Sequence, residues 1–335
     1  MSTATIAPRR SVRGFGAAPG QWVTTVLPWV VLVVLYIALV VRAPNYMTSG
    51  PLSVLTYSAT ILGVVAIGQT CVILIGGIDL SVSTVMTMTN VVSASIIGGG
   101  NTNDRLLQAV VVSLALGAVV GVLNGLIITK LGLPDMIATL AMMTIVYGAL
   151  TLYSASHLKS GYAPALVDFI TKPVLGFIMP AAAAWLVLGV VLILVFNKTS
   201  FGRQVYAVGL SRGASHAAGI SVVRTTIILY AISGVCAAAA GVLLTGQLRG
   251  MQLASGNPYQ LWTIAAVVLG GTSIFGGRGG YGNTIAGVAI IVVLQMGLLN
   301  ILGIGQAAQN ILYGLVILVM LVIFRFGSRR TGDST

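Results

Sequence analysis

The stretch NKTSFGRQVYAVGLSRGASHAAGISVVR, residues Asn197–Arg224, is the longest polar interruption between two hydrophobic halves of the chain. It contains no acidic residue. Its basic residues are Lys198, Arg203, Arg212 and Arg224. Positively charged loops between apolar segments stay on the cytoplasmic side of a membrane, so this composition favours a cytoplasmic loop, hereafter the central loop.

A short helix is expected inside the central loop. Ser211 suits the N-cap position, and Gly219 suits the left-handed position just after a helix end. The residues between them, RGASHAA, would form a turn or two, roughly 10 Å long at ~1.5 Å per residue. Such small side chains would fit a groove on a soluble partner that moves the membrane protein. The alternative is a basic cytoplasmic loop that only sets topology.

The composition excludes a water-soluble domain. Hydrophobic residues make up 57% of the chain and charged residues 7%, and the mean hydropathy is +1.03. A soluble domain carries about 25% charged residues. The net charge of +12 could indicate nucleic-acid binding, but the basic residues are scattered among apolar spans. The charge is better explained by the topology of a protein in a lipid bilayer, with no nucleic-acid partner.

Ten stretches reach or approach the roughly 20 apolar residues that a spanning helix needs. They are Thr24–Val41, Leu52–Ile75, Leu80–Ile97, Leu106–Thr129, Asp135–Tyr153, Val174–Phe196, Thr225–Thr245, Leu261–Phe275, Thr284–Leu302 and Ala307–Phe324. We therefore expect an all-α, polytopic membrane protein with some broken or re-entrant segments. Its single transmembrane domain covers residues 24–326, after a disordered cytoplasmic segment 1–23 and before a cytoplasmic tail 327–335.

Ten spans with both termini inside place most basic residues on the cytoplasmic side. The expected cytoplasmic set is Arg9, Arg10, Arg13, Lys130, Lys198, Arg203, Arg212, Arg224, Arg278, Arg325, Arg329 and Arg330. The expected external set is Arg42, Arg105, Lys159, Lys172 and Arg249. Removing one span would move the central loop outside, and the bias would be lost.

A loose internal sequence repeat suggests that the chain consists of two inverted halves. Asn124-Gly125-Leu126 and Leu131-Gly132-Leu133 precede the fifth span, as Met296-Gly297-Leu298 and Leu302-Gly303-Ile304 precede the tenth. An offset of five spans inverts one half relative to the other, a common transporter plan. The pairs Gly76-Gly77 and Gly270-Gly271 do not fit this offset.

Gly76-Gly77-Ile78-Asp79-Leu80-Ser81, hereafter the first glycine break, joins the second and third spans without a polar linker. Freed backbone amides need partners that lipid does not offer. Asp79 and nearby hydroxyls can supply them, and Asp79 could cap the third span. Alternatively, broken backbone beside an ionisable group lines a pathway or forms a gate.

Polar residues inside spans are further candidates for the pathway. Gln69, Asn90 and Asn124 carry amides that hydrocarbon would leave unpaired, so each should face the protein interior. Hydrogen bonding between helices is the main interpretation, and contact with a substrate is the alternative. The pathway and gate candidates are Gln69, Gly76, Gly77, Asp79, Ser81, Asn90 and Asn124.

No enzyme chemistry is visible in the sequence. Residues 270–280, GGTSIFGGRGG and hereafter the second glycine break, lack the Lys-Ser/Thr of a phosphate-binding loop and read as a tight cytoplasmic turn. His157 and His216 stand singly in loops, without other metal-ligand types nearby. We therefore expect no catalytic residue, no metal and no cofactor, and hence no energy source within the chain.

Three groups of motifs resemble the permease subunits of bacterial sugar ABC importers of the ribose, xylose and arabinose type. The first is Ile75–Val82, IGGIDLSV. The second combines Phe201-Gly202-Arg203, Ala207-Val208-Gly209 and Ala217-Ala218-Gly219-Ile220 in the central loop. The third is Ile264–Ser273 with Gly276–Gly279. The motifs are in the family's order and the resemblance covers residues 50–326.

The resemblance implies a ten-helix permease in the bacterial plasma (inner) membrane that dimerises, with itself or with a sister permease, around a pathway. A cytoplasmic ATP-binding subunit would grip the central loop, and an external binding protein would deliver a monosaccharide or related polyol. The implied ATPase-coupling residues are Gly202, Arg203, Gly209, Ala217, Ala218, Gly219 and Ile220. The chain departs from the family at Leu210–Gly213, where an Asn with acidic or proline neighbours is usual, and at Gln260–Trp262, where Glu-Leu-Asp is frequent.

Two other functions compete with this interpretation. A secondary transporter driven by protons or sodium needs an ionisable site at depth, and Asp79 is its only candidate. An intramembrane enzyme needs an acid–base or metal set, which the sequence does not offer. The sugar itself is not specified by the small and hydroxyl side chains expected along the pathway.

Overall fold

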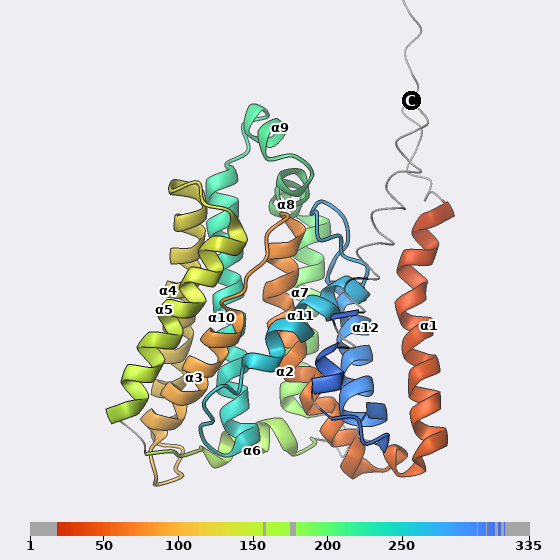
Figure 1. The fold of residues 1–335 in the computed structure, drawn as a ribbon, viewed down its shortest axis with the longest axis vertical. Helices are drawn as coiled ribbons and strands as arrows, with labels where there is room; N and C mark the ends of the chain where they lie inside the picture. The colour runs from red at the N-terminus through yellow and green to blue at the C-terminus, as the bar shows by residue number, and fades with distance from the viewer. Residues whose placement is uncertain are drawn as a thin grey trace, which may run out of the picture.

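The computed structural model describes residues 19–156, 159–174 and 179–299, together with 301–305, 307–311, 314, 315 and 318. These residues form a bundle of helices (Figure 1). In chain order the helices are α1 (Pro19–Arg42), η1 (Pro44–Met47), α2 (Ser49–Leu74), α3 (Val82–Ile97), α4 (Leu106–Lys130), α5 (Asp135–Ser156), α6 (Pro164–Thr171), α7 (Pro180–Lys198), α8 (Ser200–Leu210), α9 (Arg212–Ala217), α10 (Val222–Leu248), α11 (Asn257–Leu269), α12 (Tyr281–Val292) and the π-helical η2 (Val293–Leu299). The expected all-α, polytopic fold is confirmed.

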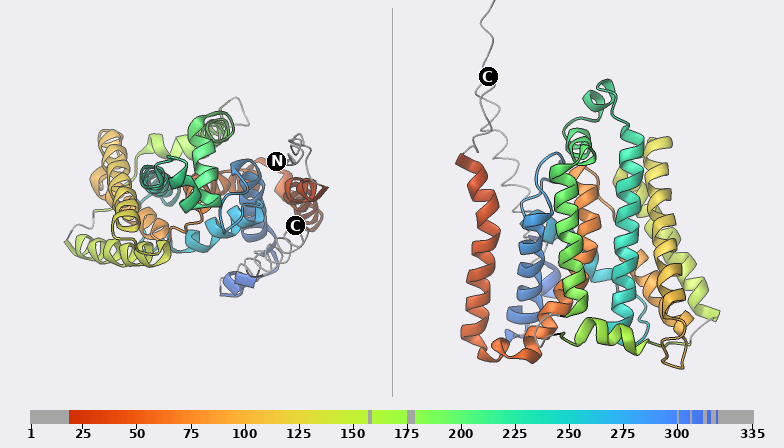
Figure 2. Two further views of the ribbon diagram at one scale, coloured as in Figure 1. Left: turned by 90° about the horizontal axis from the view of Figure 1, so that it is seen from above. Right: turned by 180° about the vertical axis from the view of Figure 1, so that it is seen from behind.

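The long helices run in alternating directions between two ends of the molecule. Helices α8 and α9 lie at one end, hereafter the α9 end, and α6 lies across the other (Figures 1 and 2). The first helix, α1, begins at the α9 end, where α2, α4 and α7 finish and α5 and α10 start. This alternation matches the order of the predicted spans.

Five helices of the described chain, α2, α4, α5, α7 and α10, are long and apolar enough to cross a membrane. Shorter apolar helices cover Val26–Arg42, Val82–Ile97 and Tyr281–Gly297. Helix α2 is central, since all its residues from Thr60 to Leu74 are buried. The outer helices expose large apolar side chains, as expected of a lipid-facing surface. On α1 and α7 these include Val30, Val33, Val34, Ile37, Val187, Val190, Val191 and Leu194.

The structure corrects several predicted boundaries. The sixth span does not start at Val174, because α7 begins at Pro180, a residue type that suits the first helical position. Helix α6 is absent from the predicted elements, because it is too short to span a membrane. Its buried residues Leu166, Val167 and Ile170 face the bundle. Helix α1 begins at Pro19, inside the segment 1–23 that the sequence predicts to be disordered. Residues 1–18 lie outside the described part.

The last predicted elements are described only in part. The ninth span begins at Tyr281 and passes into the π-helical segment η2. Most of the tenth span, Ala307–Phe324, and the tail 327–335 lie outside the described residues. The inverted repeat stays a prediction, although its paired glycines, Gly132 and Gly303, have similar φ angles of 67° and 65°.

Helices α4 and α10 approach each other through small residues. Gly117, Gly121 and Gly125 lie one turn apart on α4, and each faces the backbone of α10. A Cβ atom on Gly121 would overlap the carbonyl of Tyr230, and one on Gly117 would overlap that of Gly234. Glycine is therefore required at this crossing, where close backbone contact takes the place of a hydrophobic driving force.

We predict that Gly121→Ala destabilises the protein by about 1–3 kcal/mol, because the added methyl group overpacks the crossing of α4 and α10. The matched control is Gly148→Ala on α5, where a Cβ atom would meet nothing within 4 Å. Thermal unfolding of both variants in detergent measures the effect. Equal unfolding temperatures for the two variants would contradict the proposed packing.

Candidate functional site

The two glycine breaks and the end of α8 meet at the α9 end of the bundle. The amide of Gly277, in the second break, donates a 2.8 Å hydrogen bond to the carbonyl of Leu74 at the end of α2. A Cβ atom on Gly209 of α8 would overlap that same carbonyl and would lie 2.5 Å from the Gly277 amide nitrogen. The hydroxyl of Tyr206, also on α8, donates to the carbonyl of Gly279 at 2.9 Å. The central loop is thus packed directly against the second break and against the end of α2, just before the first break.

Asp79 closes the first glycine break from within the bundle. Its Oδ1 accepts hydrogen bonds from the amide of Ser81 at 3.0 Å and from the Ser81 hydroxyl at 2.6 Å. Its Oδ2 accepts a 2.8 Å bond from the hydroxyl of Ser233 on α10. The amide Nδ2 of Asn124 on α4 donates to Ser81 Oγ at 2.9 Å. One carboxylate therefore ties the break to α10 directly and to α4 through Ser81.

This geometry modifies the expected cap on the third span. Helix α3 begins at Val82, and Ser81 precedes it as the N-cap residue without a side-chain cap bond. Asp79 binds the amide of Ser81 rather than an amide of the first helical turn. The carboxylate thus satisfies the turn before the helix, where the backbone has left α2 and has not yet entered α3.

Helix α5 holds the other side of the first glycine break. Thr139 Oγ1 lies between two carbonyl oxygens that share its proton, 2.9 Å from that of Asp135 and 3.1 Å from that of Ile78. A Cβ atom on Gly77 would lie 2.5 Å from Asp135 Oδ2 and 2.7 Å from the hydroxyl of Tyr230. Asp135 also pairs with Arg212 of α9, with 2.9 Å between Oδ2 and Nη2. Residues of α5, α9 and α10 therefore converge on the break.

Asn90 belongs to a separate polar cluster at the opposite end of α10. Its Nδ2 donates to Thr245 Oγ1 and to the carbonyl of Gly250, both at 3.0 Å. Its Oδ1 accepts from the amide of Gln252 at 3.0 Å and from the hydroxyl of Ser255 at 3.4 Å. Every polar atom of this amide is engaged in holding the loop between α10 and α11, so its observed role is structural.

The pathway candidates are thus not one cluster. Asp79, Ser81 and Asn124 are brought together, Asn90 lies elsewhere, and Gln69 stands alone on α2. The side-chain amide of Gln69 is fully buried and has no hydrogen-bond partner among the described residues. Of the two glycines of the first break, Gly76 is exposed and Gly77 is buried.

The expected short helix of the central loop is present as α9, and both predicted ends are confirmed. The Ser211 hydroxyl accepts a hydrogen bond from the amide of Ala214 at 3.2 Å. Gly219 has φ +79°, in the left-handed region. The amides of Gly219 and Ile220 bond to the carbonyls of His216 and Ser215 at 3.0 and 2.9 Å. This pair of bonds is a Schellman motif, which gives the helix a defined end.

The expected coupling residues divide between the surface and the interior. Arg203, Ala217, Ala218 and Gly219 are exposed and Ile220 is partly buried. Gly202 is buried and Gly209 is partly buried. Gly202 and Gly209 face the rest of the protein, because a Cβ atom on Gly202 would overlap the carbonyl of Phe196.

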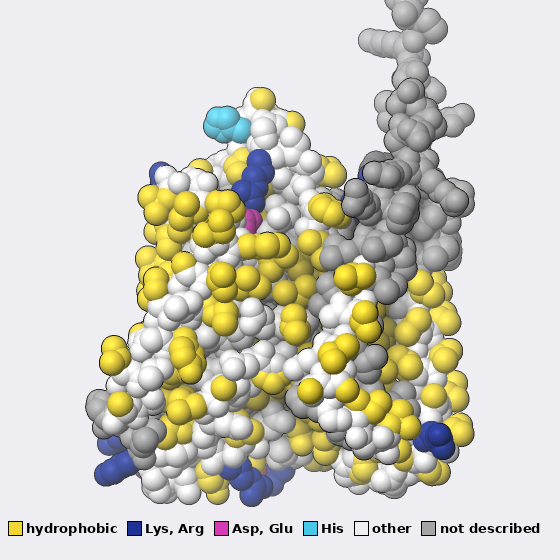
Figure 3. Space-filling view, viewed as in Figure 1, with side chains coloured by type: hydrophobic (Ala, Val, Ile, Leu, Met, Phe, Trp, Pro, Cys, Tyr) yellow, Lys and Arg dark blue, Asp and Glu magenta, His cyan; other side chains and the backbone are white. Residues whose placement is uncertain are grey.

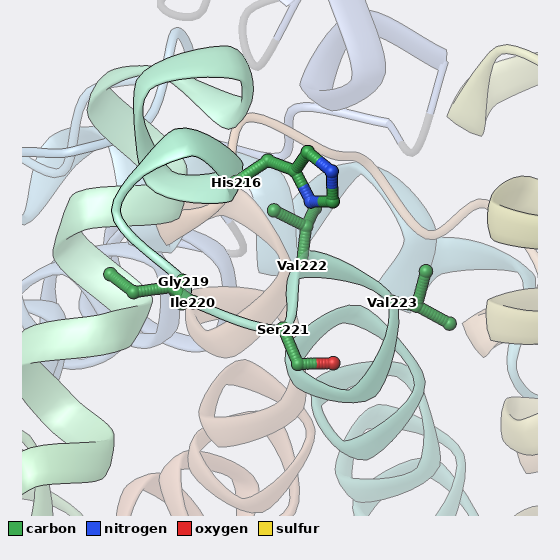
Figure 4. Close-up of a pocket in the computed structure, with 6 residues that line it drawn as sticks. All are labelled: His216, Gly219, Ile220, Ser221, Val222 and Val223. Atoms are coloured by element: carbon green, nitrogen blue, oxygen red, sulfur yellow. The ribbon is translucent and has the colours of Figure 1, made fainter.

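A shallow hollow of about 280 Å³ lies where the chain turns from α9 into α10. It is lined by His216, Gly219, Ile220, Ser221, Val222 and Val223. Figure 4 shows the imidazole of His216 beside Val222, with Ser221 at the start of α10. The hollow is open and carries both apolar and polar groups, which suits contact with another protein better than enclosure of a solute.

Sequence analysis missed Asp135, Thr139, Tyr230 and Ser233. Asp135 follows Pro134 and reads as an ordinary helix start, where a carboxylate favours the helix dipole. Ser233 and Thr139 resemble the many hydroxyl residues of apolar spans. No sequence signal distinguishes these residues, because their contacts join positions between 61 and 154 residues apart.

The sequence of this chain is similar to those of known proteins. Residues 51–324 match the family model described as "Branched-chain amino acid transport system / permease component". The ribose import permease protein of Bacillus subtilis (strain 168) is 37% identical over 89% of this chain and 92% of its own length. The L-arabinose transport system permease protein of Escherichia coli (strain K12) is 34% identical over 89% of each chain. The fructose import permease protein of Rhizobium meliloti is 33% identical over 89% of this chain and 84% of its own length. No solved structure matches the chain.

We predict that Ser233→Ala costs about 1–3 kcal/mol of stability, because it leaves a buried carboxylate oxygen of Asp79 without its donor. The matched control is Ser113→Ala, since Ser113 is equally buried and its hydroxyl has no partner within the described residues. Denaturant titration in detergent micelles compares the two variants. A Ser233→Ala protein as stable as Ser113→Ala would show that the Asp79 bonds do not hold the break.

Proposed function

The chain belongs to the family of permease components of the branched-chain amino acid transport type, and from that premise we propose that it is the permease subunit of an ATP-driven sugar importer. As a member of this family it is a multi-pass membrane protein and a non-catalytic transmembrane subunit. The proposal adds the energy source, the substrate class and the partners. Its location is the bacterial inner membrane.

The names of the relatives favour a sugar as the substrate. The family description mentions branched-chain amino acids, whereas the three relatives described above carry the names of ribose, L-arabinose and fructose. These relatives align over most of both chains, so they outweigh the general description. A monosaccharide or related polyol, delivered by an external binding protein, is therefore the proposed cargo.

The observation that carries the proposal is the position of α9. This short helix projects beyond the ends of the spanning helices (Figure 1). It is capped at both ends and exposes small side chains that leave room for a partner. It follows directly on α8, which packs on the second glycine break and on the end of α2, just before the first break. A cytoplasmic ATP-binding subunit that moves α9 would therefore act on the breaks without entering the membrane.

The basic residues support one orientation of the chain when the terminal segments are counted. Of the described basic residues, Lys130, Lys198, Arg203, Arg212, Arg224 and Arg278 lie at the α9 end, and Arg42, Arg105, Lys159, Lys172 and Arg249 lie at the other end. Lys and Arg gather at the two ends of the face in Figure 3, with apolar side chains between them. We assign the α9 end to the cytoplasm, together with the expected terminal segments and their further arginines. A second permease copy, identical or a sister chain, completes the pathway.

In this proposal the first glycine break is the gate. Its hinge is formed by Gly76 and Gly77. The hydrogen bonds that join Asp79, Ser81 and Asn124 hold it closed. Gln69, buried and unpaired within the described chain, would gain a partner when the helices around α2 separate. Asn90 anchors the external loop beside the pathway.

We predict that Gly219→Asp abolishes ATP-dependent sugar uptake while the protein still inserts into the membrane. The change forces a non-glycine residue into the left-handed conformation, at a cost of about 1–2 kcal/mol, and puts a charge on the docking helix. The measurement is uptake of labelled ribose, L-arabinose and fructose by proteoliposomes containing the complex purified through a tag on this chain.

The control for that experiment is Gly132→Asp. Gly132 is also exposed, has φ +67° and meets nothing within 4 Å, but it lies in the loop between α4 and α5. Uptake by this variant should stay near the wild-type rate. Normal uptake by Gly219→Asp, or equal loss in both variants, would contradict the role of α9.

A further inference from the structure

An ion pair joins α9 to α5 at the α9 end of the molecule. Arg212 is the first residue of α9 and Asp135 the first of α5. Their side chains are 45% and 11% exposed, and 2.9 Å separates Nη2 from Oδ2. The other ion pair of the described chain joins Asp168 of α6 to Lys172, the C-cap residue of the same helix. Among the described residues, the pair of Arg212 and Asp135 is therefore the one that connects separate helices.

The position of Arg212 is not explained by the stability of α9. A positive charge at the start of a helix opposes the helix dipole, which favours anions there. Asp135 has the favourable arrangement, because its carboxylate lies at the start of α5. The unfavourable placement of the arginine is therefore better accounted for by its partner on α5 than by its own helix.

Asp135 also touches the first glycine break. The oxygen that pairs with Arg212 is the same Oδ2 that would lie 2.5 Å from a Cβ atom on Gly77. One turn further along α5, the Thr139 hydroxyl lies between the carbonyl oxygens of Asp135 and Ile78, at 2.9 and 3.1 Å. Ile78 is followed in the chain by Asp79, whose carboxylate accepts hydrogen bonds from the hydroxyls of Ser81 and Ser233. A polar connection therefore runs from α9 through the first turn of α5 into the break.

The remaining contacts of α9 are with its neighbours along the chain, α8 and α10. Helix α8 reaches the second glycine break through Tyr206, and α10 reaches Asp79 of the first break through Ser233. Loss of the ion pair would leave those two connections in place while releasing the first turn of α5. The pair can therefore be removed without removing the packing of α9 on the rest of the protein.

We propose that the ion pair between Arg212 and Asp135 transmits the displacement of α9 to the first glycine break, which makes both residues positioning residues for transport. The inference rests on the proposed function, in which an ATP-binding subunit moves α9. Without the pair, the ATPase would still bind and turn over, but fewer of its cycles would open the gate.

The test is the number of sugar molecules transported per ATP hydrolysed by the purified complex in proteoliposomes. Arg212→Gln and Asp135→Asn should each lower this ratio about three- to fivefold, which corresponds to ~0.6–1 kcal/mol, the range of a partly exposed ion pair. The double variant should be no worse than either single variant, because the same interaction is lost once. Arg212→Lys, which keeps the charge, should stay close to wild type.

Lys172→Gln is the matched control, since it removes an exposed ion pair at the other end of the molecule and should leave the ratio unchanged. Wild-type ratios in both Arg212→Gln and Asp135→Asn would overturn the inference. So would losses that multiply in the double variant, or a lower amount of inserted complex with a normal ratio. If wild-type uptake did not require ATP, the proposed function itself would fail. ATP-dependent wild-type uptake with unaffected variants would reject the ion-pair link alone.

Discussion

Backbone that leaves a helix inside a bilayer must find hydrogen-bond partners within the protein, and the first glycine break is where this chain meets that constraint. Asp79 supplies acceptors for the Ser81 amide and for hydroxyls of Ser81 and Ser233. Because the carboxylate reaches α10, this helix must lie close to the break. The glycine crossing of α4 and α10 then brings Asn124 to Ser81. The positions of α2, α3, α4 and α10 thus depend on the hydrogen-bond partners of the first glycine break.

Three helices stop at the α9 end with the same glycine termination. Gly76 after α2, Gly271 after α11 and Gly219 after α9 have φ values of +75°, +79° and +79°. The first two terminations lead into the two breaks, and the bond from Gly277 to Leu74 joins the second break to the end of α2, just before the first break. Both breaks lie close to α8, so a force applied to the central loop meets two segments whose conformations are not fixed by helical hydrogen bonds.

Local sequence was sufficient to predict features that depend on neighbouring residues. The caps of α9 at Ser211 and Gly219, the break at Gly76-Gly77 and the apolar spans all follow from short-range rules. The sequence did not reveal α6, because eight residues are too few for a hydropathy signal. Nor did it reveal that Asp135 meets Arg212 or that Asp79 meets Ser233, since such contacts are set by tertiary packing. Asn90 and Asn124 were grouped as similar polar residues, but their partners place them in different clusters.

An ion-coupled transporter remains the natural rival for a membrane chain whose described part holds one buried carboxylate. Asp79 is only 2% exposed and accepts three hydrogen bonds, an arrangement that suits a structural clasp better than a site that must load and release an ion. The most direct measurement is uptake of labelled sugar by liposomes that contain this chain alone, under an imposed proton or sodium gradient, beside liposomes that contain the complete complex and ATP. A passive subunit moved through α9 predicts accumulation only with the complex and ATP. Uphill accumulation by the isolated chain under the gradient would contradict it.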